Sequence, residues 1–338
     1  MTNPPSEPNS AEPNPAEPHP AEFYPPVSVV VPIYNGERDL PELIERLLAQ
    51  TYPSDRVEFL LVDNGSCDRT PTLLQEATAA AAAQGRSLQA LNQTAVQSSY
   101  AARNTGIRAA VSEVLAFTDA DCYPSPTWLE HLVAPLANPK VGAVAGEVEA
   151  FPGGNWLERY AERKQTLSQK STLAHPFCPY GQTANLAVRA EVFQQVGLFR
   201  PYLTSGGDAD FCWRLQRQGG WQLAFAETAV VQHHHRSTLQ ELRRQWYRYG
   251  CSNRYLHDLH GISLTRELTT QEMGYRLGRW LLKELPLTML QWAKGKGSSI
   301  DWLITPLDLV CFEARTRGQQ QAQLPPQASQ IDWLKEGA

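Results

Sequence analysis

The sequence predicts an α/β fold with an open, mostly parallel, twisted sheet that is flanked by helices. Apolar, β-branched runs without alternation, such as VSVVVPI at 27–33, are typical of strands that are covered on both faces. Between these runs lie segments whose apolar residues recur at helical spacing, such as LPELIERLLAQ at 40–50. Because strand and helix alternate along the chain, we expect a parallel sheet in which helices form the crossovers.

The elements follow in order. In the first half we expect strands at 27–35, 57–63, 88–93 and 113–119 and helices at 40–50, 68–85 and 98–111. After Pro126 the pattern loosens. There we expect helices at 128–137, 190–199, 210–219 and 239–250, a strand at 141–151 and a late strand pair within 221–235.

Three parts of the chain differ in composition. Residues 1–22 are rich in proline and glutamate, lack lysine and arginine, and are expected to form a disordered tail rather than a signal peptide. Residues 23–260 are expected to form one catalytic-type domain. Residues 261–338 are expected to be a helical extension, partly disordered at its end.

The composition excludes some functions. A formal net charge of -5 over 338 residues gives no reason to expect a nucleic-acid partner. The six cysteines lack the spacing of zinc ligands, which indicates reduced thiols in a cytoplasmic protein; three long-range disulfides are the alternative. The segment 275–297 is amphipathic and basic. It either contacts a membrane surface peripherally or packs on the main domain.

Two acids, Asp119 and Asp121, follow the expected strand at 113–119. Residues at i and i+2 of an extended segment point to the same side, about 6.5–7 Å apart. Such a pair suits a hard divalent ion, Mg²⁺ or Mn²⁺, which prefers carboxylate oxygens. A simple polar turn is the alternative interpretation. Asn35 and Asp63 end two other strands, so these side chains are expected to face one crevice beyond the carboxyl ends of the strands.

Six motifs in one order resemble the inverting family 2 glycosyltransferases, which have the GT-A fold. They are VSVVVPIYNGE (27–37), LLVDNGSCDRT (60–70), SYAARNTGI (99–107), FTDADCYP (117–124), GQTANLAVRAEVFQQVGLF (181–199) and GGDADFCWRLQRQGG (206–220). The resemblance spans about residues 27–250. It implies transfer of a sugar from a nucleotide-diphosphate donor to an acceptor hydroxyl.

The resemblance also implies roles for individual residues. The nucleotide pocket would be lined by Pro32, Tyr34, Asn35 and Glu37, with Asp63 holding the base or ribose. Arg103 would approach the diphosphate or help order the pocket. Asp119 would face the ribose and sugar, and Asp121 would bind the metal, with Asp119 beside it. Asp208 would be the general base that takes the proton of the acceptor hydroxyl, with Asp210 as the alternative.

This chain departs from the family pattern at two points. Gly207 stands where a Glu often precedes the base, and Asn64 stands where a second acid often follows Asp63, so the nucleotide stays open. Around the base, Gly206, Gly207, Trp213 and Arg214 are candidates for contact with the acceptor, although Trp213 and Arg214 equally suit packing of their helix. In HHH at 233–235, His233 and His235 share a face, and His235 is the preferred third metal ligand.

The sequence therefore favours a metal-dependent glycosyltransferase with a glycan or lipid acceptor. Three alternatives remain open: a nucleotidyltransferase on the same type of sheet, a glycoside hydrolase with paired carboxylates, and an inactive sugar-binding or scaffold protein. PIYNGE lacks the basic, glycine-rich phosphate loop that a nucleotidyltransferase would offer.

Overall fold

The structure is a computed structural model that describes residues 23–151 and 153–334. The expected tail at 1–22 and the last four residues of the extension lie outside the described residues. Eight strands form one sheet in the order β3-β2-β1-β4-β7-β6-β8-β5. Their bounds are β1 Val27–Ile33, β2 Val57–Asp63, β3 Ser87–Asn92, β4 Val114–Thr118, β5 Cys122–Pro124, β6 Val141–Ala150, β7 Asn185–Arg189 and β8 Gln222–His233.

The sheet is mixed but mostly parallel. Four neighbouring pairs, β1 with β2, β1 with β4, β2 with β3, and β6 with β8, run parallel. The three pairs that involve β5 or β7 are antiparallel. This arrangement confirms the predicted α/β class.

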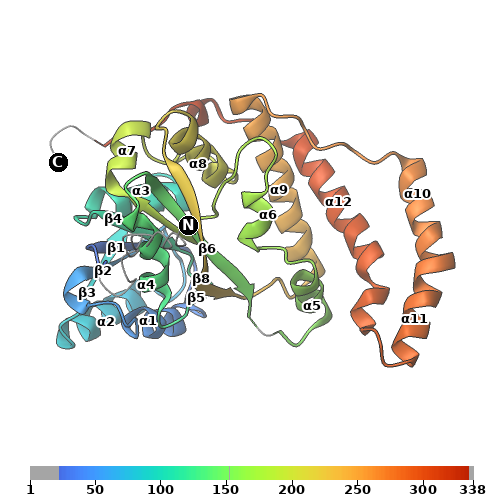
Figure 1. Cartoon of the computed structure of the whole chain (residues 1–338), viewed down its shortest axis with the longest axis horizontal. Helices are drawn as coiled ribbons and strands as arrows, with labels where there is room; N and C mark the ends of the chain where they lie inside the picture. The colour runs from blue at the N-terminus through green and yellow to red at the C-terminus, as the bar shows by residue number, and fades with distance from the viewer. Residues whose placement is uncertain (1–22, 152, 335–338) are drawn as a thin grey trace, which may run out of the picture.

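Helices cover both faces of the sheet (Figure 1). In the main body they are α1 Leu40–Leu48, α2 Thr70–Ala83, α3 Ser99–Ala109, α4 Trp128–Val133, α5 Trp156–Arg163, α6 Gln169–Leu173, α7 Ala190–Val196 and α8 Gly207–Arg217. Alternate residues of β1 enter opposite cores: Val29 and Val31 pack in one apolar cluster and Val30 in the other. A strand buried on both faces has no polar face, which explains its unbroken apolar run.

The packing of α3 on β1 places the start of that helix at the carboxyl edge of the sheet. A Cβ added at Gly106 would lie 2.4 Å from a methyl of Val30, so the helix approaches the strand more closely than a larger residue allows. In the register of the sheet Ile33 pairs with Asp63, and Asp63 pairs with Asn92. The ends of these strands therefore lie side by side, as parallel pairing requires.

Three strands differ from the sequence prediction. The segment expected as a late strand pair is the single long strand β8. Its register on β6 shifts between Gly146–Ala226 and Glu147–Val230, so residues 227–229 bulge out. The polar Glu227 and Thr228 of this bulge resemble a turn in the sequence, although the strand continues. The strands β5 and β7 carried no prediction; β5 has only three residues, too few for a periodic signal.

The extension runs from α9 Leu239–His260 through α10 Thr270–Arg279, the π-helical turn η4 Trp280–Glu284 and α11 Leu285–Ala293 to α12 Ile304–Gln321. Helices α9 and α12 pack closely at two glycines. A Cβ at Gly250 would lie 1.9 Å from the Arg315 carbonyl oxygen, and one at Gly318 would lie 2.1 Å from that of Tyr247. The proposed boundary at residue 260 stays a prediction.

We call residues 270–297, which comprise α10, η4 and α11, the helical arm. It stands away from the sheet beyond α12 (Figure 1), and none of its residues is buried. Over residues 23–151 and 153–334, no helix combines the length and the apolar character that crossing a bilayer demands.

Candidate active site

A cavity of about 430 Å³ opens at the carboxyl ends of β1 and β4. It gathers side chains from segments far apart in the sequence. Eight residues singled out from the sequence line it: Pro32, Tyr34, Asn35, Arg103, Asp119, Asp121, Asp208 and His233. This is the edge at which open α/β sheets bind ligands.

The loops after β1 and β2 are held together by hydrogen bonds. The Asn35 backbone N–H donates to the Ser66 hydroxyl at 2.8 Å, and the Asn35 side-chain oxygen accepts from the Cys67 N–H at 2.8 Å. Asn35 adopts a positive φ of 50°, which asparagine tolerates better than most residues. The loop after β2 therefore supports the loop after β1, which forms one wall of the cavity.

Glu37 and Asp63 brace this wall rather than line the cavity. The Glu37 carboxylate accepts the Arg69 N–H at 3.1 Å. Asp63 is 6% exposed, and its carboxylate accepts the Ser66 N–H at 3.0 Å. Nucleotide contacts had been expected from both side chains. In this structure their oxygens serve the loop backbone.

Arg103 lies in the first turns of α3, which Ser98 caps by accepting the Tyr100 N–H at 3.2 Å. The guanidinium donates a hydrogen bond to Asp119, and Arg103 is only 3% exposed. Burial lowers the pKa of Arg103, but the nearby charges of Asp119 and Asp208 raise it above its ordinary value. A permanent buried cation therefore sits between two carboxylates.

Asp121 faces His233 because β5 and β8 pair in antiparallel register, with Cys122 opposite His233. The His233 Nε2 lies 3.1 Å from the Asp121 carboxylate, and an Arg236 nitrogen lies 3.7 Å from the same oxygen. Burial alone would raise the pKa of Asp121, but His233 and Arg236 hold it well below its ordinary value. This carboxylate is ionised at neutral pH.

Ligand atoms of Asp121, Cys122 and His233 lie within 4.8 Å of one another, a spacing that suits a metal ion. Burial raises the pKa of Cys122 well above its usual range, so its thiol stays protonated and is a poor ligand. The carboxylate and the imidazole fit a divalent cation. This grouping contains His233, whereas the sequence favours His235 as the metal ligand. The imidazole of His235 is part-buried, with its pKa lowered to about 4 by burial and by His233.

Asp208 projects from the first turn of α8. Its carboxylate accepts a hydrogen bond from the Thr183 hydroxyl at 2.7 Å, and the preceding Gly207 N–H donates to the Tyr100 hydroxyl at 3.0 Å. Gly206 has a φ of +81°, which lets the chain turn into the helix. Burial raises the pKa of Asp208, although the charge of Arg103 opposes this.

Asp210, the alternative base, lies outside the cavity. It is 0% exposed, and its carboxylate accepts from Arg200 at 3.0 Å, from Arg214 at 3.0 Å and from His260 at 2.9 Å. Burial opposes ionisation, yet these three partners lower its pKa to about 2. Because its oxygens already accept from these three partners and it does not line the cavity, its arrangement suits a structural role.

Trp213 and Arg214 also differ from the expected contact with the acceptor. Both are 1% exposed. The Trp213 indole donates to the Cys178 carbonyl at 2.8 Å, and Arg214 donates to the carbonyl of Leu198 at 2.8 Å. The alternative interpretation, packing of the helix, therefore fits both residues.

Several cavity residues carry no prediction from the sequence. Arg236 precedes α9, while Gln245, Arg248 and Tyr249 lie on it, and all four line the cavity. The interleaved basic and aromatic residues of 239–250 were visible in the sequence. Which of them face the cavity depends on how α9 packs against the rest of the protein, and periodicity does not give that orientation.

Residues 28–197 match the sequence profile of Glycosyl transferase family 2, and residues 114–311 match that of Glycosyl transferase family group 2. Glycosyltransferase AglE of Haloferax volcanii is 34% identical over 265 residues, which cover 76% of this chain and 80% of AglE. The chain belongs to glycosyltransferase family 2. Members of this family transfer sugars from nucleotide-sugar donors, and the chain is such a glycosyltransferase.

Other family 2 relatives match less of their own length. The pre-mycofactocin glycosyltransferase of Mycobacterium tuberculosis is 29% identical over 231 residues, which are 67% of this chain and 46% of that protein. Among solved structures, the mannosyltransferase PcManGT of Pyrobaculum calidifontis, in complex with GDP-Man and Mn²⁺, superposes with a TM-score of 0.63. It is 19% identical and covers 92% of this chain and 91% of its own, so it confirms the GT-A fold.

Proposed function

We propose that this family 2 enzyme is a metal-dependent, inverting transferase that moves a hexosyl group from a nucleoside-diphosphate donor to an acceptor hydroxyl. The acceptor would be a glycan or lipid in the synthesis of a polysaccharide or glycolipid. The observation that carries the proposal is the convergence of Asp119, Asp121, Arg103 and Asp208 in one cavity. Donor, metal and base would meet there.

Mg²⁺ or Mn²⁺ would be held by Asp121 and His233, with Asp119 next to them. When bound, such an ion neutralises the charge that builds on the leaving diphosphate. The pairing of an ionised carboxylate with an imidazole 3.1 Å away supports this assignment. The Nε2 of His233 faces Asp121. The other ring nitrogen, Nδ1, is buried without a hydrogen-bond partner among the described residues.

Asp208 would act as the general base. The hydroxyl oxygen of the acceptor attacks the anomeric carbon as its proton moves to the Asp208 carboxylate. The bond from that carbon to the diphosphate oxygen breaks, and the diphosphate leaves with the electron pair. Attack from the face opposite the leaving group inverts the anomeric centre. A raised pKa suits this task because it makes the carboxylate a stronger base.

Arg103 would orient rather than react. Its ion pair with Asp119 holds that carboxylate at the cavity wall, where it would meet the ribose and sugar of the donor. Pro32, Tyr34 and Asn35 would shape the nucleotide pocket on the loop wall. Glu37 and Asp63 would support this wall from behind.

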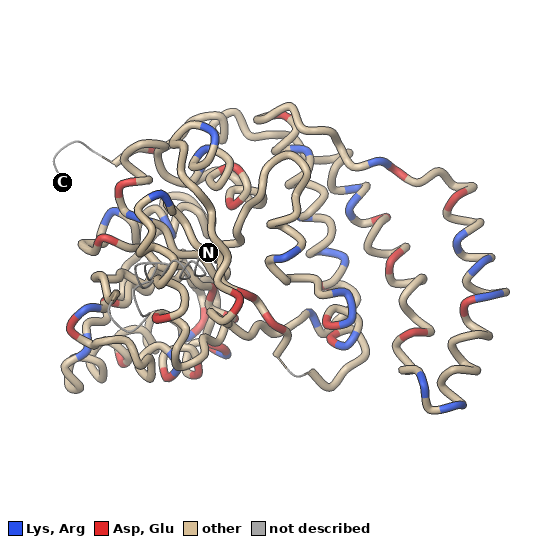
Figure 2. The backbone as a smooth tube through the Cα atoms, viewed as in Figure 1, with Lys and Arg blue, Asp and Glu red and all other residues tan. Residues whose placement is uncertain are grey.

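The helical arm would contact a membrane surface peripherally. It exposes large apolar side chains, among them Leu282 at 81% and Trp292 at 53%. The arm also carries five basic residues, Arg276, Arg279, Lys283, Lys294 and Lys296, against two acids, Glu272 and Glu284; Figure 2 shows these charges. Apolar and basic side chains together suit the headgroup region of an anionic membrane. The cysteines, which are free, support a cytoplasmic location.

A thermal-shift screen of nucleoside diphosphates with and without Mn²⁺ tests the proposed chemistry. One nucleotide should raise the melting temperature more strongly with Mn²⁺, because a ligand that binds only the folded state stabilises it by mass action. Asp121→Ala should lose the metal-dependent part of the shift. If no nucleotide changes the melting temperature under any metal condition, the proposal is wrong.

A further inference from the structure

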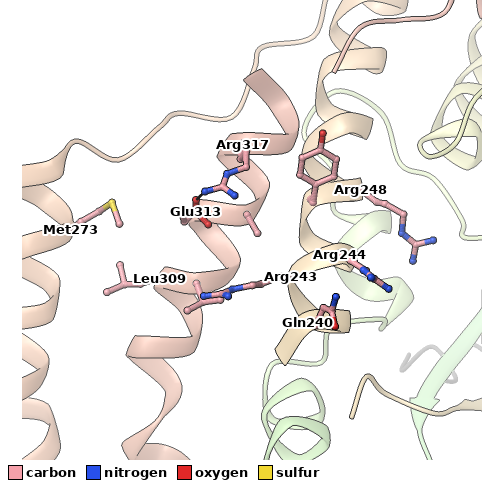
Figure 3. A pocket seen from close by; sticks show the side chains of 11 residues that line it. Gln240, Arg243, Arg244, Arg248, Met273, Leu309, Glu313 and Arg317 are labelled. Atoms are coloured by element: carbon pink, nitrogen blue, oxygen red, sulfur yellow. Dashed lines mark hydrogen bonds and ion pairs between the residues drawn. The ribbon is translucent and has the colours of Figure 1, made fainter. Parts of the chain in front are cut away.

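A groove of about 840 Å³ lies along the helical extension, next to the catalytic cavity. One face of α9 and one face of α12 form it, and Met273 of α10 adds a wall (Figure 3). Its apolar lining includes Tyr247, Leu309, Val310 and Ala314. The groove has about twice the volume of the catalytic cavity, which is about 430 Å³.

Arginines line this apolar groove. Arg243, Arg244, Arg248 and Arg317 stand against one acid, Glu313, which pairs with Arg317 at 2.5 Å. Figure 3 shows Arg243 reaching from α9 toward α12, whereas Arg244 and Arg248 point to the other side of α9. Arginine covers apolar surface with its aliphatic stem while its planar guanidinium binds phosphate. The lining therefore suits a molecule with one apolar part and one anionic part.

The groove and the catalytic cavity adjoin at α9. Arg248 lines both of them, and Gln245 and Tyr249, on the same stretch of helix, line the cavity. Tyr249 and Asp208 also line a second hollow. A molecule seated in the groove can therefore present its polar end to the cavity that holds Asp208.

We propose that the groove binds the acceptor, and that the acceptor is a lipid that carries a phosphate group. The hydrocarbon chain would lie on Tyr247, Leu309 and Val310, and the phosphate would contact Arg244 and Arg248. The hydroxyl-bearing end of the headgroup would enter the cavity and lose its proton to Asp208 as described above. This inference rests on the proposed function and names the class of acceptor for it.

Charge and continuity favour a lipid over the other occupants. Arg317 is paired with Glu313, whereas Arg244 and Arg248, on the other side of α9, carry two positive charges that complement a phosphate. Met273 belongs to the helical arm, so the groove adjoins the surface that we propose to contact the membrane, where such a lipid resides. A second copy of the chain is the other occupant that the experiment must detect.

The experiment measures binding of farnesyl phosphate by titration calorimetry, at lipid concentrations below micelle formation. Farnesol and inorganic phosphate are the comparison ligands. Leu309→Glu introduces a negative charge at a half-buried position of the groove, and Arg244→Glu reverses a charge at an exposed one. The matched control is Lys140→Glu, the same charge reversal at an exposed residue in the turn before β6.

We expect the unaltered protein to bind farnesyl phosphate at least about tenfold more tightly than either comparison ligand. Each groove variant should weaken this binding by about tenfold or more, and Lys140→Glu should leave it within about twofold. Farnesyl phosphate that binds no better than inorganic phosphate would overturn the inference. So would a Leu309→Glu variant that binds like the unaltered protein, or a dimer that this variant dissociates without any lipid binding.

The rise in melting temperature with nucleotide and Mn²⁺, measured on the same variants, separates the proposal for the groove from the proposed function. Groove variants that keep this shift and lose farnesyl phosphate binding support the assigned groove. If the unaltered protein shows no nucleotide shift, the proposed function fails, and the direct binding of farnesyl phosphate still decides what the groove binds.

Discussion

The two aspartates of the DAD segment, Asp208 and Asp210, should respond in opposite ways to the same substitution. Asp210→Asn removes the charge that compensates Arg200 and Arg214, whose side chains are 10% and 1% exposed. Removing one partner of a buried ion pair costs about 3–5 kcal/mol of the free energy of unfolding, because the remaining charges stay buried. With an unfolding entropy of about 2.1 cal/mol/K per residue over 338 residues, the melting temperature should fall by about 4–7 °C.

Asp208→Asn should leave stability within about 1 kcal/mol, because it removes a carboxylate whose burial already disfavours ionisation. Its transfer rate should fall by about 100- to 10,000-fold, the usual contribution of a general base. Calorimetric melting and initial rates with a bound donor measure both quantities. A variant at Asp208 with full activity, or an Asp210→Asn protein that is as stable as the original and inactive, would refute the assignment of the base.

Lowering the pH should weaken the buried ion pairs that Asp210 makes. The pKa of Asp210 falls from an ordinary value of 3.8 to about 2 in the folded state. A depressed carboxylate pKa contributes stability that is complete above the unfolded value and is lost as pH falls through the folded one. The free energy of unfolding of the original protein, measured with denaturant, should therefore fall as the pH is lowered from about 4 to 2. The Asp210→Asn variant should lose this part of the pH dependence.

Three further predictions concern the cavity and the helical arm. Arg103→Gln should move the acid limb of the pH profile of kcat/KM to higher pH, because the charge of Arg103 lowers the pKa of Asp208 and its removal lets that pKa rise. An acid limb that stays at the same pH would contradict this electrostatic coupling of Arg103 to the base. His233→Ala should raise the Mn²⁺ concentration for half-maximal activity by about tenfold or more, whereas His235→Ala should change it little; equal effects would contradict the metal assignment. Leu282→Glu should reduce co-sedimentation with anionic vesicles without changing the melting temperature, since that side chain is 81% exposed.

Much of the fold follows from short-range patterns. The parallel strands β1, β2 and β4 are apolar on both faces, and the sequence places their ends at Ile33, Asp63 and Thr118 within a residue or two. Glu227 and Thr228 interrupt the apolar pattern of 221–235, which predicts two strands with a turn between them. In the structure they belong to a bulge of one strand, and that bulge follows from the register of β8 on β6. Register between strands is a long-range property that local sequence does not carry.

The site was predictable where a motif fixes both residue and place. Asp119, Asp121 and Asp208 reach one cavity, as the order of motifs implies. His233 and His235 lie on the same face of the strand, so the sequence leaves them nearly equal as candidate metal ligands. The pairing of Cys122 with His233 distinguishes them, because it places His233 beside Asp121. The sequence also leaves Asp210 open as an alternative to Asp208 as the base. The buried position of Asp210 depends on Arg200 and His260, which lie 10 and 50 residues away in the chain.

The central claim is that Asp121 and His233 hold a divalent ion beside the donor diphosphate. The most direct measurement is anomalous diffraction at the manganese edge from crystals grown with Mn²⁺ and the nucleoside diphosphate that gives the largest thermal shift. The claim predicts one peak within about 2.0–2.3 Å of an Asp121 oxygen and a His233 nitrogen, next to the diphosphate. Well-ordered nucleotide in the cavity with no anomalous peak at these two side chains would contradict it.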